Sequence, residues 1–198
     1  MGDSTLAANG HRASFVIDTK RSRFTVQAFA TGLLSAMGHN PTIGIRTFNG
    51  EVRFDPVSAE ADGLRVTIQA GSLGVQDDIS DRDRREIEKL MNSDVLEAAM
   101  YPEIRYEASP ISLARLDGSL YSATLNGNLT FHGVTRSQPV TARITPMGDM
   151  LRASGEFTLK QSDYQVKPIS VAGGALKLKD ELKFSFEIVA RKQDAPAA

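Results

Sequence analysis

Strict alternation of apolar and polar residues is the feature of this sequence that most limits its fold. It is clearest in residues 121–144, where His132-Gly133 separates two alternating runs. Because successive side chains of a β-strand point to opposite faces, the pattern predicts a long antiparallel hairpin with one apolar face. Gly133 favours a turn, since glycine adopts backbone angles that other residues avoid. Pro139 has no N–H to donate and indicates a strand start or a sheet edge.

The same alternation recurs at short intervals along the chain. It predicts further strands over residues 15–18, 21–29, 43–55, 64–70, 104–106, 151–160 and 182–188. Residues 80–96 have helical spacing instead, with Ile87, Leu90 and Met91 on one face and charged residues on the other. Ser80, followed three residues later by Asp83, resembles a capping box at a helix start. About eight strands with one inserted helix indicate an all-β antiparallel barrel.

Length and composition exclude several classes of protein. With 198 residues the chain fits one domain, which can bury roughly 70% of its unfolded surface. The absence of cysteine excludes disulfides and thiolate metal sites. A net charge of −1 with scattered Lys and Arg gives no reason to expect a nucleic-acid partner. No apolar run reaches the ~20 residues that a transmembrane helix needs.

The ends of the chain differ in composition from the alternating part. Residues 14–192 are the predicted barrel domain, with an N-terminal tail over 1–13 and a C-terminal tail over 193–198. The first residues lack the basic start and the apolar stretch of ~7–15 residues of a secretory signal. We therefore expect a cytoplasmic protein, or a periplasmic one if a leader has been removed.

No pattern in the sequence is typical of catalysis or metal binding. A Gly-x-Ser-x-Gly elbow is absent, and His11, His39 and His132 lack the local spacing of a metal motif. We therefore expect no catalytic residue, no metal and no cofactor. His132 fits a turn residue. For His39 three roles remain open: a donor to a ligand head group, a partner for local backbone, or a metal ligand.

Several segments carry a family resemblance by their order and spacing. They are DTKRSRF (18–24), FNGEVRFDP (48–56), LMNSDVLEAAMYPEIRY (90–106), GNLTFHGVT (127–135) and AGGALKLKDEL (172–182). Together they resemble the YceI family of lipocalin-like, polyisoprenoid-binding proteins. The resemblance implies an extended eight-stranded antiparallel barrel with a helix over one opening. It also implies a hydrophobic tunnel for an isoprenoid chain, such as a polyprenyl phosphate or a quinone tail, and no catalytic triad.

The resemblance turns the inward-facing side chains into candidate ligand contacts. In a barrel filled by side chains the same residues would simply form the core. The candidates for the tail are Phe24, Phe29, Ile43, Ile45, Phe54, Tyr106, Phe131, Phe157, Phe184 and Phe186. His39 and Asn40 are the candidates for the head group, and we expect them to gather with Arg23 near one mouth.

The function expected from the sequence is non-enzymatic binding, storage or transport of a long-chain isoprenoid or similar amphipathic lipid. The main alternative is a protein-interaction or stress-response module whose barrel is filled by side chains. A weaker alternative is a hydrolase or metal-assisted enzyme built around His39. We also expect a homodimer, because long strands leave edges or apolar patches that pairing can cover.

Overall fold

A computed structural model of the chain describes residues 13–31, 40–55, 60–171 and 176–193. The helical elements are η1 (Ala70–Ser72), α1 (Asp81–Leu90), the π-helical turn η2 (Met91–Val95) and η3 (Gln161–Tyr164). The strands are β1 (Ala13–Ile17), β2 (Arg23–Thr31), β3 (Thr42–Ile45), β4 (Phe48–Asp55), β5 (Glu60–Gln69), β6 (Leu73–Val75), β7 (Glu103–Asp117), β8 (Leu120–Phe131), β9 (Val134–Met147), β10 (Met150–Lys160), β11 (Ser170–Val171) and β12 (Leu176–Lys192).

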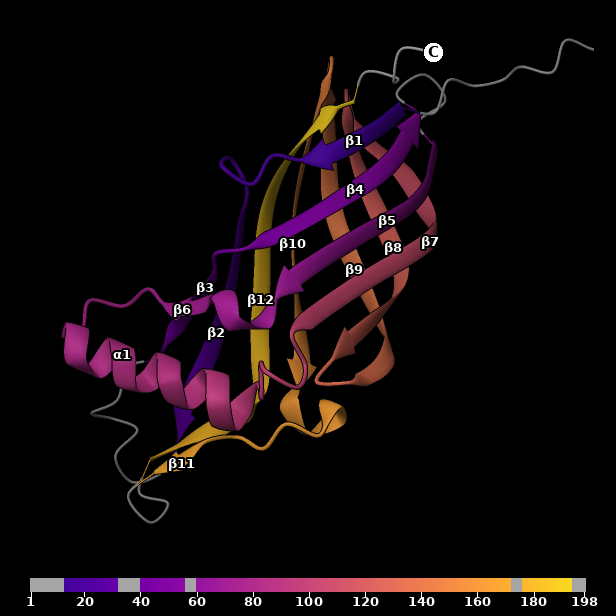
Figure 1. Cartoon of the computed structure of the whole chain (residues 1–198). Helices are drawn as coiled ribbons and strands as arrows, with labels where there is room; N and C mark the ends of the chain where they lie inside the picture. Colours follow the sequence, from indigo (N-terminus) through magenta and orange to yellow (C-terminus); the bar gives the residue numbers. More distant parts are fainter. Residues whose placement is uncertain (1–12, 32–39, 56–59, 172–175, 194–198) are drawn as a thin grey trace, which may run out of the picture.

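Eight of the strands form a closed antiparallel barrel (Figure 1). The order around the ring is β1-β4-β5-β7-β8-β9-β10-β12, and β12 pairs back onto β1. The closing ladder joins Phe15 to Lys192, Val16 to Arg191 and Ile17 to Ala190. On one side β2, β3 and β6 extend the wall beyond this ring, and β11 pairs with β12. The structure confirms the predicted eight-stranded barrel with one inserted helix.

The strand predicted over residues 43–55 is broken in the structure into β3 and β4. The two parts have different neighbours, since β3 pairs with β2 and β6 while β4 pairs with β1 and β5. At the break Ser72 holds both backbone amides: its carbonyl accepts from Arg46 at 3.2 Å, and its Oγ accepts from Thr47 at 3.0 Å. Apolar and polar residues alternate on both sides of the break, so the sequence pattern could not show that β3 and β4 pair with different strands.

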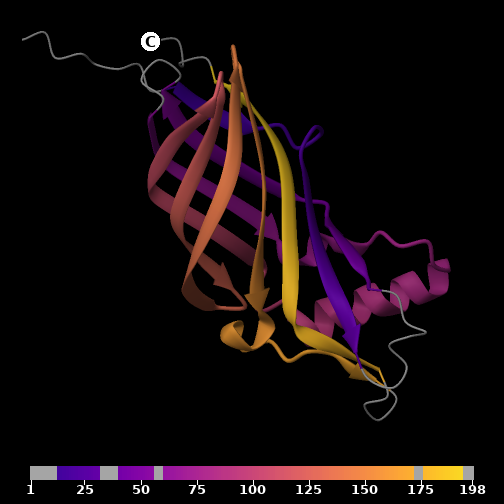
Figure 2. The same cartoon turned by 180° about the vertical axis from the view of Figure 1, so that it is seen from behind.

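The hairpin predicted around His132-Gly133 is present as β8 and β9 (Figure 2). Its register joins Tyr121 to Ile144 at one end and Phe131 to Val134 at the other. His132 and Gly133 form the turn with φ angles of 50° and 73°, in the left-handed region that favours glycine at the second position. The pairing of β9 with β10 begins only at Ala142. Pro139 therefore lies where one side of β9 has no ladder partner, which confirms the edge interpretation.

The predicted helix over residues 80–96 is divided into α1 and η2. Ser80 caps α1: its Oγ accepts from the Asp83 amide at 3.1 Å and donates to Asp83 Oδ2 at 2.7 Å. No residue of α1 is fully buried. Polar contacts attach it instead, because Glu88 Oε1 accepts from Arg46 at 2.7 Å and from the Val75 amide at 3.0 Å. Figure 1 shows α1 at one end of the barrel.

Two groups of buried side chains form the core, one toward each end of the barrel. The group near α1 includes Met91 and Leu96 and is rich in Ile, Leu and Val. The opposite group contains five alanines: Ala61, Ala108, Ala123, Ala142 and Ala190. Phe15 and Phe54 meet there edge to face at 6.2 Å and are almost completely buried. Small side chains suit a narrowing barrel interior.

We predict that Ser80→Ala destabilises α1 locally by about 1 kcal/mol, because it removes the N-cap acceptor. Since α1 buries no residue, the barrel should keep its global stability. Hydrogen exchange should therefore accelerate at the α1 amides and remain unchanged in β7 and β8. Ser80→Asn preserves a capping side chain and serves as the control. Equal acceleration in barrel and helix would contradict this prediction.

Candidate functional site

An apolar cavity of ≈ 230 Å³ runs inside the barrel. Its lining comes from both core groups, from Leu96 and Met91 at the α1 end to Phe54 and Ala61 at the other. The free volume lies slightly below the ~300–1,000 Å³ typical of small-molecule sites. Because its lining extends from one core group to the other, the cavity is elongated, and its small volume suits a narrow chain.

No charged side chain lines this cavity among the described residues. The polar lining residues are Tyr106, Gln161 and Ser185, and each already has a partner in the wall. Gln161 Nε2 donates to the Lys179 carbonyl at 2.9 Å, and Ser185 Oγ lies 2.8 Å from Thr25 Oγ1. A lining of this kind favours an apolar chain and offers no nucleophile–base pair.

The structure places nine of the predicted contacts on the cavity wall. They are Phe24, Ile43, Ile45, Phe54, Tyr106, Phe131, Phe157, Phe184 and Phe186. All nine are on strands, and each points inward because it shares the inward phase of its strand. Their contact with a ligand remains a prediction.

Phe29 does not line the cavity, and its prediction as an inward residue is wrong. Val26 and Ala28 of the same strand line the cavity, so Phe29 falls on the outer face by alternation. The Lys179 ammonium lies 5.9 Å from the centre of its ring. The aromatic character of Phe29 suggested a tail contact, but its phase in the strand already pointed outward.

The polar groups expected at one mouth do not gather there. Asn40 is exposed, and its Oδ1 accepts from the Ala30 amide at 3.0 Å near the end of β2. Arg23 begins β2, where it pairs in register with Glu187. The two lie at opposite ends of a nine-residue strand, about 23 Å apart at 3.3 Å per residue. His39 lies outside the described residues.

Sequence reasoning missed the lining residues that come from α1 and from the turns. Ile87, Met91, Val95 and Leu96 cover the cavity from α1, η2 and the residue that follows, and Gln161 comes from η3. The helical spacing of Ile87 and Met91 predicted an apolar helix face, but it could not predict that this face covers the barrel cavity. Gln161 gave no signal, since a lone glutamine after a strand is ordinary.

Of the described lining residues only Ile87, on α1, is classed as exposed, at 39%. The lining therefore comes nearest to solvent at the α1 end. At the opposite end the paired rings of Phe15 and Phe54 close the barrel. We therefore take the α1 end as the mouth of the cavity and the Phe15–Phe54 end as its closed end.

The YceI-like domain family matches residues 15–190. The chain belongs to this family. A UPF0312 protein of Pseudomonas aeruginosa (strain LESB58) is 29% identical over 157 residues, which cover 76% of each chain. A UPF0312 protein of Pseudomonas savastanoi pv. phaseolicola is 27% identical over 202 residues, covering 97% of this chain and 95% of the relative.

Two solved structures share the YceI-like fold. BcnA of Burkholderia cenocepacia has a TM-score of 0.66 and 21% identity, with 87% of this chain and 98% of that chain covered. A polyisoprenoid binding domain from Saccharophagus degradans, implicated in plant cell wall breakdown, has a TM-score of 0.66 and 14% identity. That comparison covers 92% of this chain and 99% of the other. At these identities the likeness shows the fold.

The segment that follows η2 contacts the β8–β9 turn of the YceI-like barrel through Glu97 and Tyr101. His132 Nε2 lies 2.7 Å from Glu97 Oε2, and the Tyr101 and His132 rings are 4.3 Å apart. Glu97 follows Leu96, which lines the cavity. His132 is therefore both a turn residue, as predicted, and an anchor for the segment that covers the mouth.

No metal site accompanies the cavity in the part of the chain that the structure describes, where no three His, Asp or Glu side chains could hold an ion. No described helix is both long and apolar enough to cross a membrane.

Burial raises the pKa of Tyr106 to about 12 from its ordinary value of 10.0, because the charged form is desolvated. The folded pKa exceeds the unfolded one, so the stabilisation is complete below pH 10 and is lost as the pH rises through 12. We predict that the free energy of unfolding declines over this range, measured by urea denaturation.

Tyr106→Phe should make that decline shallower. Part of it should persist, because burial also raises the pKa of Tyr164. The difference in stability between the two proteins near neutral pH is the control, because it measures the loss of the hydroxyl contacts alone. An identical decline in the Tyr106→Phe variant would contradict the prediction.

Proposed function

We propose that this YceI-like barrel binds the tail of one long-chain isoprenoid or similar amphipathic lipid, such as a polyprenyl phosphate or a quinone. It holds or carries this molecule and catalyses no reaction on it. The observation that carries the proposal is the elongated cavity with an uncharged, almost wholly apolar lining. The Saccharophagus degradans domain, whose fold is similar, is itself described as polyisoprenoid binding, which supports the same ligand class.

The hydrophobic effect supplies the affinity for a tail. Transfer of apolar surface from water into such a lining is favourable by about 25 cal/mol per Å². A charged or strongly polar ligand would lose its hydration without compensation, because Tyr106, Gln161 and Ser185 already have partners in the wall. The cavity therefore selects for an apolar chain and leaves the polar head at the mouth.

The alternative, an interaction module with a filled barrel, needs an interior without free space. The cavity of ≈ 230 Å³ argues against it. Native mass spectrometry of the purified protein, followed by lipid extraction, tests the two directly. An isoprenoid in the extract supports the proposal. An empty barrel that also takes up no added isoprenoid would favour the interaction module.

Lysines around the mouth favour an anionic head over a neutral one. Residues 164–179 contain Lys167, Lys177 and Lys179 and no acidic residue. Ile169 and Leu178, which lie between or beside these lysines in sequence, line the cavity. No described carboxylate forms an ion pair with these three lysines. Leu178 lines the cavity, so Lys177 and Lys179 lie on the outer face of β12, where the Lys179 ammonium is 5.9 Å from the centre of the Phe29 ring. To bind a phosphate at the mouth these side chains would have to reach over the rim, where no described carboxylate is paired with them.

We predict that Phe184→Asp abolishes isoprenoid binding, since an unpaired charge inside an apolar cavity is strongly disfavoured. Phe184 stacks on Phe157 with ring centres 5.0 Å apart, so Phe184→Leu keeps an apolar lining and should change the binding free energy by only about 1 kcal/mol. Titration with a fluorescent isoprenoid analogue measures both. Circular dichroism confirms the fold, and full binding by a folded Phe184→Asp variant would place the tail elsewhere.

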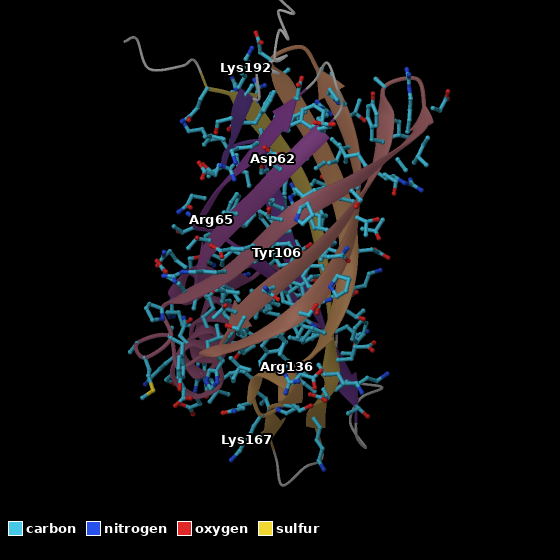
Figure 3. The ribbon with its side chains drawn as sticks, turned by 90° about the vertical axis from the view of Figure 1, so that its right-hand side faces the viewer. Asp62, Arg65, Tyr106, Arg136, Lys167 and Lys192 are labelled. Carbon is cyan, nitrogen blue, oxygen red and sulfur yellow. The ribbon has the colours of Figure 1, made fainter. Side chains whose placement is uncertain are left out.

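The head-group proposal gives a separate prediction. Replacement of Lys167, Lys177 and Lys179 together by Gln should weaken binding of a polyprenyl phosphate about tenfold, or ~1.4 kcal/mol. Binding of the matching uncharged polyprenol should not change. Lys192→Gln is the control, because Lys192 lies at the opposite end of the barrel from Lys167 (Figure 3). Equal losses for phosphate and alcohol would contradict a charge-based role.

A further inference from the structure

Tyr106 lies midway along the barrel, at the boundary between the two core groups. Figure 3 shows it between Lys192 at one end and Lys167 at the other. It lines the cavity and packs against both the group near α1 and the alanine-rich group. Of the described residues, only Leu64 and Phe157 share this double contact. These three side chains therefore mark the level at which the two groups meet, which we call the waist.

The Tyr106 ring is held in one position by two kinds of contact. Its hydroxyl lies within donating distance of two backbone carbonyls, 3.2 Å from Leu125 O and 3.0 Å from Gln138 O. The ring also occupies the space above Gly127, where an added Cβ would lie 2.5 Å from its Cζ and hydroxyl. A ring fixed at both its edge and its face cannot swing aside without breaking buried hydrogen bonds.

Aromatic rings face Tyr106 from other parts of the wall. In the ring of eight strands, β12 is four places from β7 and so lies opposite Tyr106. β12 carries Phe184, which stacks on Phe157 with an interplanar angle of 9°. It also carries Phe186, whose ring fills the space above Gly155. Large aromatic rings therefore line the cavity on both of these walls.

The cavity continues beyond the waist. Ala61, Ala142 and Ala190 belong to the alanine-rich group and line the cavity. Their small side chains leave space between the waist and the closed end at Phe15 and Phe54. A tail entering from the α1 end must pass Tyr106 to use this space.

From this geometry we infer that Tyr106 is a specificity-determining residue that limits how long an isoprenoid tail the barrel admits. The inference rests on the proposed lipid-binding function and adds to it the property that decides among isoprenoids. Short tails occupy the half of the cavity nearest α1. Longer tails must pass the fixed Tyr106 ring to enter the alanine-lined half. Removal of the ring widens this passage.

The test compares tail lengths in matched variants. Farnesol, geranylgeraniol and solanesol, which share an alcohol head and increase in length, are titrated against the unmodified protein, Tyr106→Ala and Tyr106→Phe. Tyr106→Ala should shift the ratio of affinities toward solanesol over farnesol by about tenfold. Tyr106→Phe should shift it less, because the ring stays above Gly127 but loses both carbonyl contacts.

Ile104→Ala is the matched control, since Ile104 is a buried lining residue on the same strand, two positions away. It should alter affinity for all three alcohols alike. If Tyr106→Ala does not fold, judged by its circular dichroism melt, Tyr106→Leu replaces it and should give the same direction of shift. An unchanged ratio in a folded Tyr106 variant overturns the inference. Failure of the unmodified protein to bind any of the three alcohols overturns the proposed function itself.

Discussion

The ladder between β1 and β12 is the interaction on which the rest of the structure depends. It joins residues 15–17 to residues 190–192, near the two ends of the described chain. It closes the ring by pairing β1 with β12, so every strand of the ring has a neighbour on both sides and the ring has no free edge. Closure also separates an inside from an outside. Only then do the alternating apolar faces of eight strands become one water-excluded interior rather than the exposed side of an open sheet.

Inside the closed barrel, large aromatic side chains pack against glycines, which have no side chain. Gly127 makes room for Tyr106, and Gly155 makes room for Phe186. An eight-stranded barrel is just wide enough either to be filled by side chains or to hold a narrow ligand. Here aromatic rings line the waist and meet at the Phe15–Phe54 end, and a cavity remains between the walls. The cavity thus follows from where the rings are placed, not from a lack of apolar residues.

The cavity wall is held together by apolar packing, whereas polar contacts contribute more to the attachment of the segments that cover it. The cavity wall is apolar and belongs to the barrel core, whereas α1 buries no residue and is attached by Glu88 through Arg46 and the Val75 amide. The covering segment around η2 combines both forces, since Met91 and Leu96 are buried in the core and Glu97 contacts His132. Of the cover, only α1 is therefore attached without a fully buried side chain. Because fold does not determine function, the uncharged lining of the cavity carries the functional argument.

The sequence by itself determined which side of each strand is apolar, the β8–β9 turn at His132-Gly133 and the helix start at Ser80. Alternation has a period of two, so it assigns a residue to one face of its strand, and nine predicted contacts accordingly line the cavity. The phase of β2 also placed Phe29 outside, although its aromatic ring suggested otherwise. A local period carries no information on which strands pair or where their ends meet. The break at Arg46-Thr47, the separation of Arg23 from Asn40 and the contact of Glu97 with His132 were therefore decided by the tertiary structure alone, because each depends on contacts between segments distant in the chain.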